Sequence, residues 1–246
     1  GNLIQKWIDD NSLGFGNGWE PYPSSLRIVN WIKWFLLDLN SNNNVNQIWL
    51  DSLVIQTRFL SQNLEYHLLG NHLFANAKAL VFAGLFFKGK EADHWYQLGV
   101  SIINRELSEQ VLSDGGNFEL SPMYHAIFLE DLLDLVNIHQ AYDRSLPDNL
   151  ENKIVQMLEW LKVMCHPDKG IAFFNDSALG VAPSFVELLS YSDRLGIVFK
   201  NNQVNRLTHL KESGYIRVED ENMVIIADVA DIGPDYIPGH GHADAL

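Results

Sequence analysis

Residues 70–87 read GNHLFANAKALVFAGLFF, a long apolar run that opens on a short polar segment. The run predicts a buried helix. Asn71 is expected to cap it, because a short amide side chain can accept from the free N–H groups of a first helical turn. His72 then falls in that first turn. A helix N-terminus with an amide and an imidazole beside it suits a carboxylate; the alternative is an ordinary cap followed by a surface histidine.

A second stretch has the same form, because residues 119–125 read ELSPMYH and open another apolar helix. Ser121 is the expected N-cap and Pro122 the first helical residue, which suits the fixed φ of proline. Tyr124 therefore falls in the first turn of its helix. If the helices are stacked as hairpins, the two helix mouths can meet on one rim. The alternative for Tyr124 is a core tyrosine with a backbone partner.

Apolar residues recur at helical spacing through most of the chain, and short polar loops interrupt them. The expected helices span residues 2–10, 26–40, 45–67, 71–88, 91–112, 122–142, 147–166 and 183–193. Ser24 or Ser25 is expected to cap the second of these. Helices that are apolar on more than one side need neighbours on both sides. Stacked helical hairpins meet that need, either as an α-solenoid or closed into an α/α toroid.

The pattern changes after residue 207. Residues 213–220 alternate between apolar and polar side chains, and residues 223–229 read as a buried strand. Glu221 and Asn222 between them indicate a hairpin turn. The sequence therefore predicts a mainly α chain, with a helical domain over residues 1–206 and the first strands of a β domain over residues 207–246.

The composition limits the partners of the chain. It has 246 residues, 47% of them hydrophobic, a net charge of −14 and a pI near 4.9. Such a balance argues against binding to nucleic acid or to a membrane surface. No apolar run is long enough to span a bilayer, and no signal peptide is visible. The single Cys165 excludes an internal disulfide.

Three segments together resemble the heparinase II/III-like polysaccharide lyases. They read GNHLFANAKAL, DGGNFELSPMYH and PGHGHADAL, and the resemblance extends from residue 19 to Leu246. It implies an incomplete α/α toroid followed by an antiparallel β-sandwich. It also implies an enzyme that cleaves an acidic, uronic-acid-containing polysaccharide by β-elimination, with a periplasmic or cell-surface location favoured. The motifs do not specify the polymer or the oligomeric state.

The resemblance also implies roles for individual residues. Asn71 and His72 would neutralise the uronate carboxylate, and Tyr124 would be the general acid. His240 would lie at the catalytic centre, and the base role stays open between it and Tyr124. His242 would be a zinc ligand in the full-length protein, with the remaining ligands beyond Leu246. The β strands are few, and His240 and His242 lie close to the end of the chain, so we expect this chain to bind acidic oligosaccharide without cleaving it efficiently.

Five further residues are candidates for substrate binding. Trp19 and Tyr22 are aromatic residues of a Pro- and Gly-rich loop that could stack on a sugar ring or simply pack in the core. Arg27 could meet a carboxylate or sulfate. Asn175 and Asp176 lie in an irregular segment and could face the cleft, or form a turn built on side-chain hydrogen bonds.

Two other functions compete with the lyase interpretation. A glycoside hydrolase on an α/α toroid needs two carboxylates flanking the scissile bond. Glu20, Glu119 and Asp176 are loop or helix-mouth acids that could supply them. A helical scaffold that binds glycans without chemistry is the second alternative. A lyase differs from both because its product carries a conjugated double bond that absorbs ultraviolet light.

Overall fold

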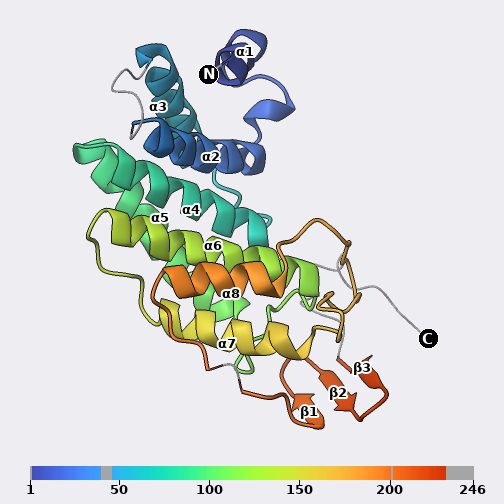
Figure 1. Ribbon diagram of the computed structural model, residues 1–246. Helices are drawn as coiled ribbons and strands as arrows, with labels where there is room; N and C mark the ends of the chain where they lie inside the picture. The colour runs from blue at the N-terminus through green and yellow to red at the C-terminus, as the bar shows by residue number, and fades with distance from the viewer. Residues whose placement is uncertain (1, 40–45, 201, 231–246) are drawn as a thin grey trace. The chain divides into compact units, whose positions relative to one another are not determined.

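The structure is a computed structural model that describes residues 2–39, 46–200 and 202–230 (Figure 1). The helices are α1 (Asn2–Asp10), the 3₁₀ helix η1 (Asn17–Trp19), α2 (Pro21–Leu39), α3 (Gln47–Gln62), α4 (Gly70–Phe86), α5 (Lys90–Gln110), α6 (Pro122–Ala141), α7 (Leu150–Val163) and α8 (Phe185–Arg194). The strands are β1 (Leu207–Leu210), β2 (Tyr215–Glu219) and β3 (Val224–Asp228). Within the described residues no strand precedes Leu207, so the predicted helical layer followed by β strands is confirmed.

The chain forms two compact units. The first contains Gly1–Glu106 and Ala141–Arg144, and the second contains Leu107–Gln140 and Ser145–Leu246. The sheet belongs to the second unit, together with α6, α7 and α8. The domain boundary predicted at residue 207 coincides with the change from helix to strand, and as a domain boundary it stays a prediction.

The first unit is built around α4, which is buried along almost its whole length because its apolar residues face every direction. Helices α2 and α3 pack against it. The short link between α4 and α5 makes these two helices antiparallel neighbours, and glycines let their backbones approach closely. A Cβ at Gly84 would lie 2.6 Å from the backbone N of Tyr96, and one at Gly99 would lie 2.8 Å from the carbonyl of Ala77.

Helix α2 begins at Pro21, so the caps predicted at Ser24 and Ser25 are wrong. Pro21 occupies the first helical position, where its missing N–H costs nothing. Both serines are buried inside the helix. The Ser25 hydroxyl donates to the carbonyl of Pro21 at 2.8 Å, one turn back. A serine within a helix commonly finds its hydrogen-bond partner in this way.

In the second unit α8 packs against α6 and α7 (Figure 1). Tyr191 of α8 connects to α6 through two hydrogen bonds. Its hydroxyl donates to Oδ1 of Asp134 at 3.0 Å and accepts from the amide of Asn137 at 2.8 Å. Gln140 then donates to the carbonyl of Leu195 at 2.9 Å, which fixes the end of α8.

The sheet has the order β1-β2-β3, and both pairs are antiparallel. The hairpin predicted over residues 213–229 is confirmed, whereas β1 is an additional strand. Tyr215 and Arg217 of β2 are buried against the helices. The opposite face carries Leu207, Val218 and Ile225, which are aligned across the three strands and exposed.

The turn between β1 and β2 is held by Asp114, which lies in the loop before α6. One oxygen of its carboxylate accepts from the backbone N–H groups of Glu212 and Ser213 at 3.0 and 2.8 Å, and from the Ser213 hydroxyl at 2.9 Å. The indole N–H of Trp160 donates to the same hydroxyl at 2.8 Å. Arg217 donates to the carbonyl of Cys165 at 2.6 Å, so the sheet is attached to the C-terminal end of α7.

No helix in the described part of the chain is both long and apolar enough to cross a membrane.

Candidate functional site

The N-terminal cap of α4 lies two residues earlier than predicted. The helix begins at Gly70 and its N-cap is Leu69, whose side chain cannot cap, so the cap predicted at Asn71 is wrong. Leu69 has φ 57° and ψ −153°, and Gly70 has φ 54°. Such a backbone conformation costs a leucine roughly 1–3 kcal/mol. Asn71 and His72 both lie in the first turn and are half-buried, and for His72 this position is the predicted one.

A hydrogen-bonded network lies behind His72 in the first unit. The Glu65 carboxylate is buried, and its Oε1 lies 3.0 Å from Nδ1 of the His72 ring. Its Oε2 accepts from the Asn76 amide at 3.0 Å. The backbone N–H of Glu65 donates to Oδ1 of Asn76 at 2.9 Å, and the Asn76 amide also donates to the Ser25 hydroxyl at 3.0 Å. The imidazole is therefore held from its inner side.

The two aromatic candidates take different positions. Trp19 ends the 3₁₀ helix η1, is only 4% exposed, and packs with its ring centre 5.7 Å from Trp7 and 5.3 Å from Phe59. Its burial supports the core alternative over sugar stacking. Tyr22 lies in the first turn of α2, not in the predicted loop, and its ring stacks on His72 with centroids 4.4 Å apart. Of the predicted residues, Tyr22 and His72 are thus brought together.

Arg27 makes contacts with neutral groups. Its Nε–H donates to Gln56 at 2.6 Å, its Nη2 donates to the Ser24 hydroxyl at 3.1 Å, and its guanidinium lies 3.8 Å from the centre of the Trp7 ring. Burial lowers the pKa of Arg27 to about 10, so the side chain is charged at neutral pH. No carboxylate in the described ranges forms an ion pair with it. Its role toward a substrate carboxylate or sulfate stays a prediction.

The mouth of α6 follows the prediction closely. Pro122 is the first helical residue, and the Ser121 hydroxyl accepts from the backbone N–H of Tyr124 at 3.4 Å, as an N-cap does. Ser177 satisfies the next free donor, because its hydroxyl accepts from the backbone N–H of Met123 at 3.2 Å. Leu120, just before the cap, has φ 58°, so both candidate helices follow a leucine with positive φ.

The segment around Asn175 is fastened to this helix mouth. Its amide donates to the carbonyl of Leu120 at 2.8 Å and to the Tyr215 hydroxyl at 3.1 Å. The Tyr215 hydroxyl in turn donates to the carbonyl of Leu120 at 2.6 Å. These bonds support the turn interpretation of residues 175–177, in which Asn175 acts on the protein backbone. Asp176 is half-buried beside Tyr124, and its role toward substrate stays a prediction.

The electrostatic surroundings of Tyr124 favour a proton donor. Burial raises the pKa of its phenol above the usual 10.0, and the negative charges of Asp176 and then Glu119 raise it further. A raised pKa keeps the hydroxyl protonated across the physiological range. Among the described residues these surroundings fit a general acid better than a base, since a tyrosine base needs positive charge nearby.

His125 is fully buried and plays a structural part. Its Nδ1 accepts from the backbone N–H of Asn117 at 3.2 Å, its Nε2–H donates to the carbonyl of Met157 at 3.0 Å, and its ring stacks on Trp160 at 4.3 Å. Burial lowers the pKa of His125 to about 3. The ring is therefore neutral and fixes the α6 mouth against α7.

The buried His125 predicts a pH-dependent stability. In the unfolded chain its pKa is near 6.5, so the unfolded state binds a proton between pH 6.5 and 3 that the folded state does not. The stabilisation is complete above pH 6.5 and is lost as the pH falls toward 3. We expect urea unfolding to show a loss of about 2 kcal/mol from this group between pH 6.5 and 5. His125→Gln should reduce that slope; an unchanged slope would contradict the assignment.

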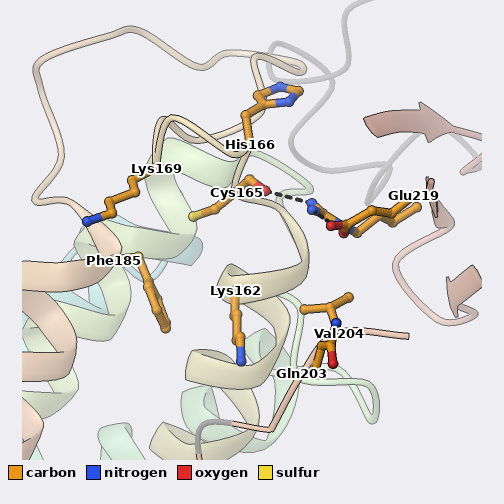
Figure 2. A pocket seen from close by; sticks show the side chains of 9 residues that line it. Lys162, Cys165, His166, Lys169, Phe185, Gln203, Val204 and Glu219 are labelled. Atoms are coloured by element: carbon orange, nitrogen blue, oxygen red, sulfur yellow. Dashed lines mark hydrogen bonds and ion pairs between the residues drawn. The ribbon is translucent and has the colours of Figure 1, made fainter. Parts of the chain in front are cut away.

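A pocket of about 460 Å³ lies at the C-terminal end of α7 in the second unit (Figure 2). Lys162, Cys165 and Phe185 contribute to its wall. Burial raises the pKa of the Cys165 thiol to about 11, so it is protonated and unsuited to act as a nucleophile. The pocket contains none of the residues that the sequence predicted for the site.

Two predicted residues lie outside the described part of the chain, namely His240 and His242. In the described ranges no group of three histidine, cysteine or acidic side chains is placed to hold a metal ion. The zinc site therefore stays a prediction, as does the catalytic place of His240. His72 and Tyr124 belong to different units, and their approach to one sugar stays a prediction as well.

Sequence reasoning missed Glu65 and Asn76. Asn76 offered a signal, because a polar residue one turn after His72 interrupts an otherwise apolar run and must find a partner when buried. Glu65 offered none, since no regular spacing relates it to His72 across the irregular segment before α4.

Two family models match the chain. The model described as Heparinase II/III N-terminus matches residues 4–204, and the one described as Heparinase II/III-like, C-terminal, matches residues 202–246. The chain belongs to the heparinase II/III family. The resemblance seen in the three sequence motifs is thereby confirmed.

Individual relatives also support membership of the heparinase II/III family. A heparin-sulfate lyase of Bacteroides stercoris is 32% identical over 165 residues, which are 65% of this chain and 25% of that protein. A heparin-sulfate lyase of Pedobacter heparinus is 30% identical over 186 residues, which are 70% of this chain and 27% of that protein. The chain thus spans about a quarter of the length of these curated heparinase II/III relatives.

A crystal structure of heparinase III resembles the chain with a TM-score of 0.74 and 22% identity, covering 92% of this chain and 40% of that one. At this identity the likeness shows the fold. That fold is an α/α toroid followed by a β domain, which confirms the fold class predicted for this heparinase II/III chain.

Proposed function

We propose that this heparinase II/III protein is a polysaccharide lyase that cleaves a glycosaminoglycan by β-elimination next to a uronic acid. The proposal rests chiefly on Tyr124. It is a tyrosine with a raised pKa in the first turn of α6, in a chain of this family whose α4 mouth carries Asn71 and His72. The names of the curated relatives, heparin-sulfate lyases, favour a glycosaminoglycan over alginate.

The chemistry explains the residue types. The proton on C5 of a uronate is too weakly acidic while the neighbouring carboxylate bears its full charge. In our proposal Asn71 and His72 donate hydrogen bonds to that carboxylate. These bonds strengthen as the enolate-like intermediate forms, so they stabilise the transition state more than the bound substrate.

Tyr124 is proposed to protonate the departing glycosidic oxygen. Its raised pKa supports this role, because the phenol is still protonated when the glycosidic bond breaks and can then donate its proton to the leaving oxygen. The base that removes the C5 proton is His240 if the proton and leaving group lie on opposite faces of the sugar, or Tyr124 if they share a face. Zinc binding by His242 is a separate proposal, and no step above uses a metal.

Ultraviolet absorbance tests the function directly. The full-length protein is incubated with heparan sulfate, chondroitin sulfate, hyaluronan and alginate, and both absorbance and new reducing ends are recorded. A lyase gives both signals in equal amounts. A hydrolase using acids such as Glu119 and Asp176 gives reducing ends without absorbance, and a glycan-binding scaffold gives neither; either outcome would overturn the proposal.

Replacing His72 with alanine is expected to lower kcat/KM by about 10²–10³-fold, since one donor to the developing charge is lost. The measurement is initial velocity on the best substrate of the panel. His67→Ala is a suitable control, because His67 is an exposed histidine of the same segment and should change little. Turnover like that of the wild type in His72→Ala would remove this residue from the mechanism.

A further inference from the structure

We infer that Glu65 is a positioning residue that decides which ring nitrogen of His72 carries the proton. The inference rests on the proposed function, in which His72 faces a uronate carboxylate. Its observations all lie in the first unit. The Glu65 side chain is buried, and its Oε1 is 3.0 Å from Nδ1 of His72, whose own side chain is 37% exposed.

The directions of the hydrogen bonds between Glu65, Asn76 and Ser25 follow by elimination. A backbone N–H can only donate, so the atom of Asn76 that faces the backbone N–H of Glu65 is its oxygen. The Asn76 nitrogen therefore supplies both remaining hydrogens, one to Oε2 of Glu65 and one to the Ser25 hydroxyl. The hydroxyl in turn donates to the carbonyl of Pro21. Oε2 of Glu65 is thus an acceptor, as it is in an ionised carboxylate.

An ionised carboxylate accepts only, so Nδ1 of His72 must be the protonated nitrogen. When the ring is neutral, Nε2 then carries a lone pair. A lone pair repels a substrate carboxylate, whereas the N–H of the doubly protonated ring attracts one. Glu65 thus makes His72 useful for neutralising a carboxylate only in its imidazolium form.

Two titratable side chains face the His72 ring in the described part of the first unit. Glu65 lies at Nδ1, and Tyr22 of α2 stacks on the ring face with centroids 4.4 Å apart. The stacked phenol restricts rotation of the ring, and Nδ1 faces Oε1 of Glu65. The protonation pattern of the ring nitrogens therefore depends on Glu65.

Glu65→Gln reverses the pattern without changing the shape of the side chain. The Asn76 amide still needs an acceptor, so the new glutamine would turn its oxygen toward Asn76 and its NH₂ toward His72. That NH₂ donates to Nδ1, which forces the neutral ring to carry its proton on Nε2. A neutral His72 could then donate to a substrate carboxylate.

The first measurement does not depend on activity. Long-range ¹H–¹⁵N spectra of the histidine-labelled full-length protein, with His72 assigned by its absence in His72→Gln, distinguish a protonated ring nitrogen from a bare one. In the neutral His72 ring we expect Nδ1–H in the wild type and Nε2–H in Glu65→Gln. Nε2–H in the neutral wild-type ring would overturn the inference, even if the variant failed to fold.

The second measurement is the pH dependence of kcat/KM. The wild-type kcat/KM should decrease at alkaline pH because one protonated histidine is lost. One pH unit above the midpoint of this decrease, it should be about tenfold below its maximum. Glu65→Gln should fall less than twofold from its own maximum at that pH. Glu91→Gln is the matched control, because it removes the charge of an exposed ion pair with Arg58 in the same unit and should keep the wild-type profile.

The outcomes separate the two proposals. Identical pH profiles for the wild type and Glu65→Gln, in a wild type that cleaves its substrate, would overturn the role of Glu65 and leave the lyase function standing. A wild type with no eliminative product on any uronate polymer would overturn the function itself.

Discussion

Tyr124→Phe is expected to lower kcat by about 10²–10⁴-fold while leaving KM nearly unchanged. The substitution removes one hydroxyl and keeps the ring, so it deletes a proton-transfer group without disturbing the mouth of α6. The cap built by Ser121 involves the backbone of Tyr124 and survives the change. The measurement is steady-state turnover by ultraviolet absorbance, together with substrate binding by calorimetry.

Tyr142→Phe is the matched control for this prediction. Tyr142 is also a half-buried tyrosine whose pKa is raised by burial, but it follows α6 instead of opening it. Its loss should leave kcat within about twofold. If Tyr124→Phe retained more than a tenth of wild-type turnover, another group would have to protonate the leaving oxygen.

Trp160→Ala is expected to destabilise the second unit by about 3–5 kcal/mol, the range for a large buried aromatic residue. Trp160 is 1% exposed, stacks on His125 and meets Tyr215 edge-on at 5.8 Å. Its indole N–H also donates to Ser213. One side chain therefore connects the α6 mouth, α7 and the sheet. Urea unfolding followed by circular dichroism gives the change.

Two further variants serve as comparisons: one removes the hydrogen bond to Ser213 but keeps a buried ring, and the other removes an exposed ring. Trp160→Phe keeps an aromatic ring but loses the bond to Ser213, and should cost about 1–3 kcal/mol because the hydroxyl loses a buried donor. Phe173→Ala removes an aromatic side chain that is 62% exposed and should cost less than about 1 kcal/mol. A Trp160→Ala cost as small as that of Phe173→Ala would show that the sheet is not held through this residue.

The start of α6 was predictable because its signals are local. Ser121 and Pro122 lie next to each other and suit the N-cap and first helical positions, and no neighbouring residue competes for these roles. The start of α2 was missed because two serines looked like caps, although Pro21 had already set the helical φ three residues earlier. The start of α4 was missed because Leu69 and Gly70 have positive φ. A leucine in the sequence does not indicate such a backbone conformation.

Partners distant in sequence explain the other differences. Strand β1 is four residues long, and its own sequence pattern does not identify it as a strand. Its pairing with β2 does. The Glu65–His72 contact crosses an irregular segment, so helical periodicity gives no hint of it. Sequence reasoning named His72 and Tyr124 because both sit at helix mouths, and it missed the group behind His72 that controls its ring.

The bonds that fasten the α6 mouth also set an order of events during synthesis. Leu120 is held by the Tyr215 hydroxyl, 95 residues later, and Asp114 by Ser213, 99 residues later. At a translation rate of about 5–20 residues per second, roughly 5–20 s separate the two ends of each bond on the ribosome. Helix α6 can form early from local contacts, whereas the backbone that aims Tyr124 must wait for β2. The residue proposed to transfer the proton is thus among the last parts of its unit to reach its final position.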